Sequence, residues 1–312
     1  MKKTVKALTN SYKKMSNWGK VLVFIILFLL LIGIFKHFNN LKHGQEGFVD
    51  KSNYVFVKDT KVYDEFYSQI YDFLVFSDVR TDFEIGSVLN LVEPTQSIKL
   101  LDIGSGTGTL IGNLAKQQSY QELVGIDVSK EMIARSKVSF PENTWVVGDA
   151  LDGMQFQPQS FTHVSCFYFT VYYFKDKRQL FQNCFNWLMP GGYFILHLVN
   201  RDNFDPILPP GNPLYIVSPQ KYAKKRITKT KVNFNDFVYN ANFNLEGDLA
   251  TFDEKFKFKD GHVRHQQQTL YMEDTEVILT IAQQCGFTLH SIVDMVKCAY
   301  EYQYIYVFNR PS

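Results

Sequence analysis

Residues 100–110 read LLDIGSGTGTL, and this stretch decides the fold of the chain. An apolar run ends in Asp102, three glycines follow at Gly104, Gly106 and Gly108, and a helical pattern comes after them. Glycine suits such a turn because it adopts backbone conformations that a Cβ atom disfavours, and because it lets a ligand approach the main chain. The stretch therefore predicts a strand, a tight ligand-binding loop and a helix.

Strand and helix patterns alternate on the carboxyl side of this loop, which is typical of a parallel sheet with helices on both faces. A last helix and two antiparallel strands close the chain. We expect an α/β fold with a doubly wound, mostly parallel seven-stranded sheet. The predicted strands are 98–103, 122–127, 144–149, 161–169, 193–199, 286–295 and 302–310, and the predicted helices are 109–117, 129–137, 177–188 and 274–286.

The alternation breaks over residues 203–272, which are rich in proline, then basic, then alternately polar and apolar. The Asp260-Gly261 pair between two alternating segments predicts a hairpin turn. We expect an antiparallel β insertion here. Upstream, Tyr63, Tyr67 and Tyr71 recur every four residues, which places them on one side of a helix.

A membrane helix is predicted near the N-terminus. Residues 21–35 read VLVFIILFLLLIGIF without a charge, and extension to 18–38 adds an aromatic residue at each end and enough length to span a bilayer. A cleaved signal peptide is disfavoured because no small residues follow the apolar run. The predicted organisation is a basic tail (1–17), a transmembrane helix (18–38), a linker (39–60) and a globular domain (61–312) with its insertion at about 203–272.

The side of the membrane on which the domain lies stays open. Residues 1–20 hold six lysines and no acid, which favours a cytosolic N-terminus and an exported body. Against this, no Asn-x-Ser/Thr sequon occurs, so glycosylation has left no trace in the sequence. Residues 1–20 hold six of the 33 basic residues, so the remainder carries 27 basic side chains against 31 acidic ones and predicts no nucleic-acid partner.

Three acidic residues at successive strand ends describe the ligand of the glycine loop. Asp102 is an unfavourable neighbour for a pyrophosphate but would attract an ammonium group. Thr109 stands where a dinucleotide-binding loop has its third glycine. Asp127 can accept hydrogen bonds from two ribose hydroxyls, and Asp149 from an exocyclic amine. Together they predict a nucleoside with a cationic, amino-acid-like tail.

At this point the chain resembles the class I S-adenosylmethionine-dependent methyltransferases. LLDIGSGTG resembles the first motif of that family, GIDVSKEMI the ribose-binding second strand, VVGDA the turn that contacts adenine, and LMPGGYFILH the segment that leads into the fifth strand. The resemblance implies a methyltransferase domain over 61–312 with S-adenosyl-L-methionine as cofactor. It implies these cofactor-binding residues: Tyr67, Asp102, Gly104, Ser105, Gly106, Asp127, Val128, Met132, Asp149 and Ala150.

Methyl transfer from a sulfonium depends mainly on alignment and desolvation, so no catalytic residue is assigned. Side chains that could project toward the methyl group are those of Tyr168, Thr170, Tyr172 and His197. We expect a membrane-anchored methyltransferase for a small-molecule or lipid-like acceptor. The alternatives are a protein or nucleic-acid methyltransferase and an inactive cofactor-binding scaffold. Four scattered cysteines without metal-ligand spacing predict no metal site, and the oligomeric state is not predicted.

Overall fold

The computed structural model describes residues 16, 18–21, 23, 53–75, 78–91, 98–117, 120–208 and 219–312. The chain divides into two units, 1–50 and 51–312. In the first unit, residues 18–21 and 23 are helical. The predicted tail except Ser16, the remainder of the predicted span 18–38 and linker residues 39–52 lie outside the described residues. Among the residues that are described, no helix has the length and apolar character needed to cross a membrane.

A seven-stranded sheet forms the centre of the second unit, as the sequence predicts. Its strand order is β11-β12-β6-β5-β2-β3-β4. Only β12 runs antiparallel to its neighbours in this sheet, and the other adjacent pairs are parallel. The strands are β2 (Ile98–Ile103), β3 (Tyr120–Asp127), β4 (Thr144–Val147), β5 (Phe161–Cys166), β6 (Leu188–Val199), β11 (Thr288–Asp294) and β12 (Gln303–Asn309).

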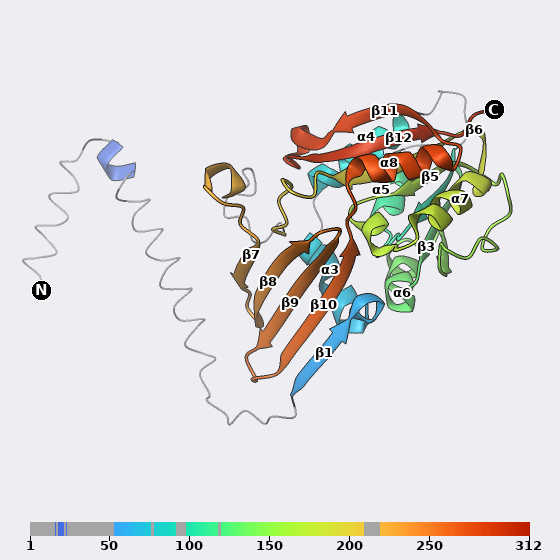
Figure 1. Cartoon of the computed structure of the whole chain (residues 1–312). Helices are drawn as coiled ribbons and strands as arrows, with labels where there is room; N and C mark the ends of the chain where they lie inside the picture. The colour runs from blue at the N-terminus through green and yellow to red at the C-terminus, as the bar shows by residue number, and fades with distance from the viewer. Residues whose placement is uncertain are drawn as a thin grey trace, which may run out of the picture. The chain divides into compact units, whose positions relative to one another are not determined.

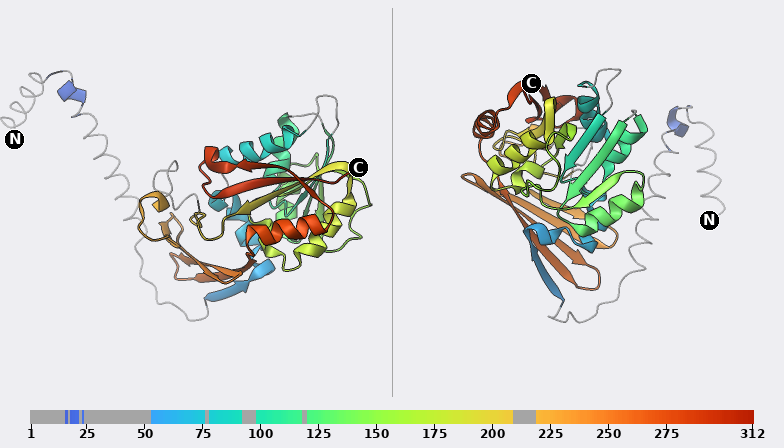
Figure 2. Two further views of the ribbon diagram at one scale, coloured as in Figure 1. Left: turned by 45° about the horizontal axis from the view of Figure 1, so that its top comes forward. Right: turned by 90° about the vertical axis from the view of Figure 1, so that its right-hand side faces the viewer.

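Helices cover both faces of this sheet because its central strands are apolar on both sides. Leu100 and Leu101 are both fully buried, yet they belong to different core clusters, since successive residues of a strand point to opposite faces. One cluster includes side chains of α4, α5 and α6, and the other includes side chains of α7 and α8. Figure 2 shows helices on both sides of the sheet. These helices are α4 (Asp78–Leu89), α5 (Thr109–Gln117), α6 (Lys130–Ser139), α7 (Lys177–Trp187) and α8 (Thr275–Gln284).

The predicted insertion forms a second sheet with the order β1-β10-β9-β8-β7. Its last four strands are antiparallel, and Asp260 and Gly261 lie in the turn between β9 and β10, as predicted. A third apolar core, which includes Leu74 and Phe256, lies between this sheet and α3 (Glu65–Val75). The strands are β1 (Tyr54–Lys58), β7 (Lys229–Asn233), β8 (Phe237–Glu246), β9 (Leu249–Phe258) and β10 (Val263–Tyr271).

Strand β1 was not anticipated, because residues 54–60 fall in the predicted linker. The strand pairs in parallel with β10, with Tyr54 opposite Val263, and lies along the outer edge of the second sheet (Figure 1). It continues into the 3-10 helix η1 (Asp59–Val62), and the domain in the structure therefore begins upstream of residue 61. A pairing across some two hundred residues leaves little trace in local sequence periodicity.

Candidate active site

The glycine loop between β2 and α5 is held in a shape that other residues tolerate poorly. Gly104 has φ +68° and Gly106 has φ +55°, both in the left-handed region. A Cβ atom at Gly104 would lie 2.4 Å from the Cγ2 atom of Thr170. The amides of Gly104 and Ser105 donate to the carbonyl oxygen of Ile126, which ties the loop to β3. The turn is therefore held in one conformation, and its two glycines add no side chain to its surface.

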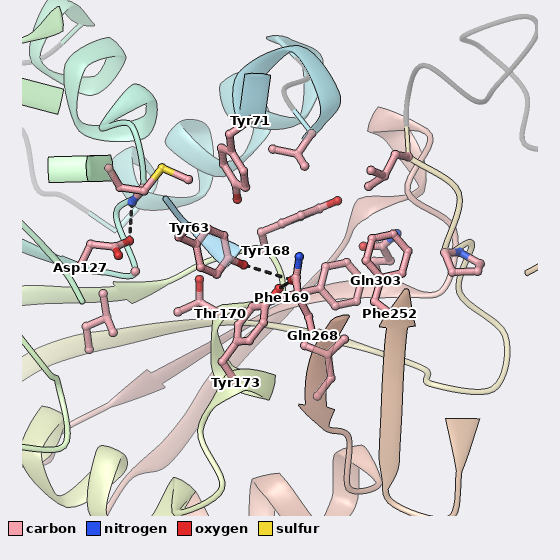
Figure 3. A pocket seen from close by; sticks show the side chains of 18 of the residues that line it. Tyr63, Tyr71, Asp127, Tyr168, Phe169, Thr170, Tyr173, Phe252, Gln268 and Gln303 are labelled. Carbon is pink, nitrogen blue, oxygen red and sulfur yellow. Dashed lines mark hydrogen bonds between the residues drawn. The ribbon is translucent and has the colours of Figure 1, made fainter. Parts of the chain in front are cut away.

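Asp127 lies at the end of β3 and faces the loop (Figure 3). Its carboxylate accepts hydrogen bonds from the amide of Gly106 at 2.9 Å and from the amide of Ser129 at 2.8 Å. Burial raises the pKa of Asp127, while these two amides oppose the shift. Each carboxylate oxygen keeps a second lone pair, so the group can still accept two hydroxyl protons.

A cavity of about 650 Å³ opens in front of the loop and of Asp127. One end is formed by the loop and by β3, and the other end by aromatic side chains beneath the second sheet, among them Phe252 (Figure 3). Seven of the ten predicted cofactor-binding residues line it: Tyr67, Gly104, Gly106, Asp127, Val128, Met132 and Ala150.

Asp102 and Ser105 border a smaller adjoining cavity of about 80 Å³. Asp102 is 4% exposed, and its carboxylate accepts a hydrogen bond of 2.7 Å from the hydroxyl of Ser165. Burial raises the pKa of Asp102 to about 7, against the opposing effect of that hydroxyl. The buried Ser105 hydroxyl has no hydrogen-bond partner within the described part of the chain. A cationic ligand group at this place would stabilise the ionised form of Asp102.

Asp149 is the predicted cofactor residue that the structure does not bring to either cavity. Its side chain is exposed and accepts a hydrogen bond from the amide of Leu151, as a turn residue does. Its neighbours Gly148 and Ala150 line the large cavity instead. The chain reaches the cavity at this turn through small residues rather than through the carboxylate.

Two of the four side chains proposed to face the methyl group lie elsewhere. Tyr168 and Thr170 line the large cavity, whereas His197 and Tyr172 do not. The Tyr172 hydroxyl is buried and accepts a hydrogen bond from the amide of Val199. His197 is fully buried, and burial lowers its pKa to about 3, so it is neutral and packed in the core. Of the four candidates, only Tyr168 and Thr170 therefore line the cavity, and His197 is a packed core residue.

Arg80 is the functional candidate that sequence reasoning missed. It borders the small cavity together with Asp102 and is 6% exposed. Its guanidinium lies 3.4 Å from the carboxylate of Glu84 and stacks 4.2 Å from the ring centre of Tyr168. A buried cation and a buried anion beside one cavity can hold the carboxylate and the ammonium of an amino-acid group. The only signal in the sequence is a single arginine between apolar segments.

Comparison with known proteins agrees with this geometry. Residues 101–196 match the model of a methyltransferase domain. A demethylmenaquinone methyltransferase from Chlorobaculum parvum is 34% identical over 113 residues, which are 36% of this chain and 46% of that protein. The chain thus spans about half the length of the curated relatives it matches.

Solved structures share the fold over most of the chain. An S-adenosylmethionine-dependent methyltransferase from Clostridium acetobutylicum has a TM-score of 0.60 at 18% identity, and the match covers 79% of this chain and 98% of that chain. An amino pentose methyltransferase from Micromonospora echinaspora, solved with S-adenosylmethionine bound, has a TM-score of 0.53 at 16% identity and covers 74% of this chain and 90% of its own.

Residues 101–196 therefore form a methyltransferase domain, and the fold is shared with S-adenosylmethionine-dependent methyltransferases. The residues present fit that cofactor. Gly104 and Gly106 line the large cavity without a side chain, Asp127 has free acceptor capacity, and Asp102 is a buried carboxylate suited to a cation.

Proposed function

We propose that this protein transfers a methyl group from S-adenosylmethionine to a small, largely apolar acceptor. The observation that carries the proposal is that one large cavity joins the glycine loop and Asp127 to aromatic side chains beneath the second sheet, here called the aromatic chamber. A chamber roofed in this way suits a small molecule better than a protein or nucleic-acid strand. The relatives named as acting on a quinone precursor and on an amino sugar are in keeping with a small acceptor.

The bound cofactor would supply an electrophilic methyl group on a sulfonium. Asp127 would hold the ribose, Met132 and Ala150 would contact the adenine, and Asp102 with Arg80 would hold the methionine end. The aromatic chamber excludes water and orients the acceptor, which suffices for a displacement with a good leaving group. Of the side chains that the sequence suggests near the methyl group, those of Tyr168 and Thr170 line this cavity.

Equilibrium binding of S-adenosylhomocysteine tests the cofactor site. Asp127→Ala should weaken binding by about 1 to 3 kcal/mol through lost ribose hydrogen bonds. Asp149→Ala is the matched control and should bind as the wild type does, because Asp149 is exposed and lines neither cavity. Equal affinity of wild type and a folded Asp127→Ala variant would contradict the site.

Incubation of the protein with methyl-labelled S-adenosylmethionine and a lipid and metabolite extract tests the acceptor class. Label in a small, solvent-extractable product supports the proposal. Label only in protein or nucleic acid would favour the macromolecular alternative, and binding without turnover would favour a scaffold.

We propose in addition that residues 18–38 anchor the protein in a membrane. The support is the uncharged stretch 21–35 between Lys20 and Lys36, which is long enough with its flanks to span a bilayer. An anchor would place the domain near acceptors that partition into lipid. The full chain should resist extraction from membranes by alkaline carbonate, and Leu30→Arg should release it. Protease protection of the domain in sealed vesicles would decide between the two orientations.

A further inference from the structure

A line of buried polar side chains crosses the second sheet and ends at the large cavity. Its centre is Glu254 on β9, which is fully buried. The carboxylate accepts hydrogen bonds from the hydroxyls of Tyr67 and Tyr239 and from the side-chain amides of Gln266 and Gln268. Four donors around one carboxylate hold it rigidly in a place where an unpaired charge would be costly.

Arg264 fixes the orientation of the Gln266 side chain. Arg264 can only donate, and its Nε atom lies 2.8 Å from the side-chain oxygen of Gln266. The amide nitrogen of Gln266 must therefore face Glu254, to which it donates at 2.7 Å. Arg264 itself is held by the carboxylate of Asp64 at 2.7 Å.

The orientation of the Gln268 side chain, at the cavity wall, follows from its hydrogen bond to Glu254. Its amide nitrogen donates to Glu254 at 3.0 Å, so its side-chain oxygen faces the opposite way. That oxygen accepts hydrogen bonds from the hydroxyls of Tyr63, at 3.3 Å, and of Tyr173 (Figure 3). All three residues line the cavity, between Asp127 and the aromatic end (Figure 3).

The two phenols consequently show only lone pairs to a ligand. Burial raises the pKa of Tyr63 and of Tyr173 well above the ordinary tyrosine value, so both stay protonated. Each phenol has one proton; that of Tyr173 is donated to Gln268, and that of Tyr63 is directed toward Gln268 and the Tyr173 hydroxyl. An oxygen in this state can accept a hydrogen bond from a ligand but cannot donate one.

We propose that Tyr63 and Tyr173 select methyl acceptors that present an O–H or N–H donor, and that Glu254 and Gln268 are positioning residues that set this preference. The inference rests on the proposed methyltransferase function, because it assigns this wall to the acceptor. An ether or a carbonyl has no proton for the wall, so it leaves the two phenol oxygens unpaired. A product in which the hydroxyl has been methylated also lacks this proton, which favours its release.

Binding of two probes to the full chain saturated with S-adenosylhomocysteine tests the proposal. The probes are 2-naphthol, which donates a hydrogen bond, and 2-methoxynaphthalene, which does not. The wild type should bind 2-naphthol about five- to tenfold more tightly, the value of one net hydrogen bond. Tyr63→Phe and Tyr173→Phe should each reduce this preference, and the double variant should abolish it.

Gln268→Leu tests the positioning role, because it frees both phenols to donate and should reverse or remove the preference. Tyr71→Phe is the matched control, since it removes a phenol oxygen from the same cavity without touching Gln268, and it should keep the preference. Saturable S-adenosylhomocysteine binding by each variant verifies its fold.

If S-adenosylhomocysteine does not bind the wild type, the proposed function fails. If it binds but the wild type shows no preference for 2-naphthol, binds neither probe, or keeps its preference in the folded double variant, only the present inference is overturned.

Discussion

Asp102 should couple cofactor binding to a proton near neutral pH. In the folded protein without ligand, burial raises its pKa from 3.8 to about 7. The difference corresponds to about 4 kcal/mol between the two protonation states. At pH 6 about nine tenths of the Asp102 carboxyls are protonated, and at pH 8 about one tenth. A ligand ammonium needs the ionised form, so affinity for S-adenosylmethionine should be about tenfold weaker at pH 6 than at pH 8.

The sign of the stability effect follows from the same shift. Because the folded pKa is the higher one, the neutral carboxyl stabilises the ligand-free fold fully below the unfolded value of 3.8. This contribution is lost as the pH rises through about 7. The melting temperature of the ligand-free wild type should therefore fall relative to Asp102→Asn between pH 5 and pH 8.

Calorimetric titration at pH 6 and pH 8, in buffers of different ionisation enthalpy, measures both the affinity and the protons released. The titration of the ligand itself is common to wild type and Asp102→Asn, so their difference reports Asp102. Glu84 needs its own control, because burial raises its pKa to about 7 as well. Proton release that persists in Asp102→Asn and disappears in Glu84→Gln would refute the assignment.

Three further substitutions follow from the structure. In thermal or urea denaturation, Gly104→Ala should lower the free energy of unfolding by about 2 to 4 kcal/mol, because a left-handed backbone is combined with a clash at 2.4 Å. Gly247→Ala is the comparison, since Gly247 has φ +59° but open space around it, and it should cost about 1 kcal/mol. Arg80→Met should weaken S-adenosylhomocysteine binding about ten- to a hundredfold in calorimetric titration, and recovery by Arg80→Lys would show that charge matters. Lys177→Met should destabilise the fold by about 2 to 3 kcal/mol in urea denaturation, because the buried ammonium lies 2.6 Å from the carboxylate of Glu273; a change below about 0.5 kcal/mol would contradict the structural role.

The parts of the fold that the sequence predicts are those with strong local patterns. The apolar run before the glycine loop, the helix that begins after Ser129 and the Asp260-Gly261 hairpin each depend on neighbouring residues. The Ser129 hydroxyl accepts a hydrogen bond from the amide of Met132, as expected of a residue that caps a helix. Such local chemistry survives folding because tertiary contacts reinforce it.

The parts that escaped prediction depend on contacts between distant segments. Strand β1 acquires its partner from β10, and Arg80 becomes a site residue only because α4 packs beside the glycine loop. His197 is the converse case. It has suitable chemistry at a suitable strand position, but its side chain is turned into the core. Periodicity places a residue on an element and does not choose between the available faces.

The buried side chains of Glu254 and Arg264 connect the insertion to the segment formed by Asp64 and α3. Arg264 on β10 binds Asp64, just before α3, and Glu254 on β9 binds Tyr67 within α3. These contacts fix the segment whose tyrosines line the cavity from Asp127 to Gln268. Loss of the Glu254 carboxylate would leave four donors without an acceptor. The part of the cavity wall that these donors form would then be less rigid. The second sheet thus covers the cavity and also positions the tyrosines of residues 63–71 that line it. Substitutions in the insertion can therefore change the acceptor specificity while the glycine loop stays the same.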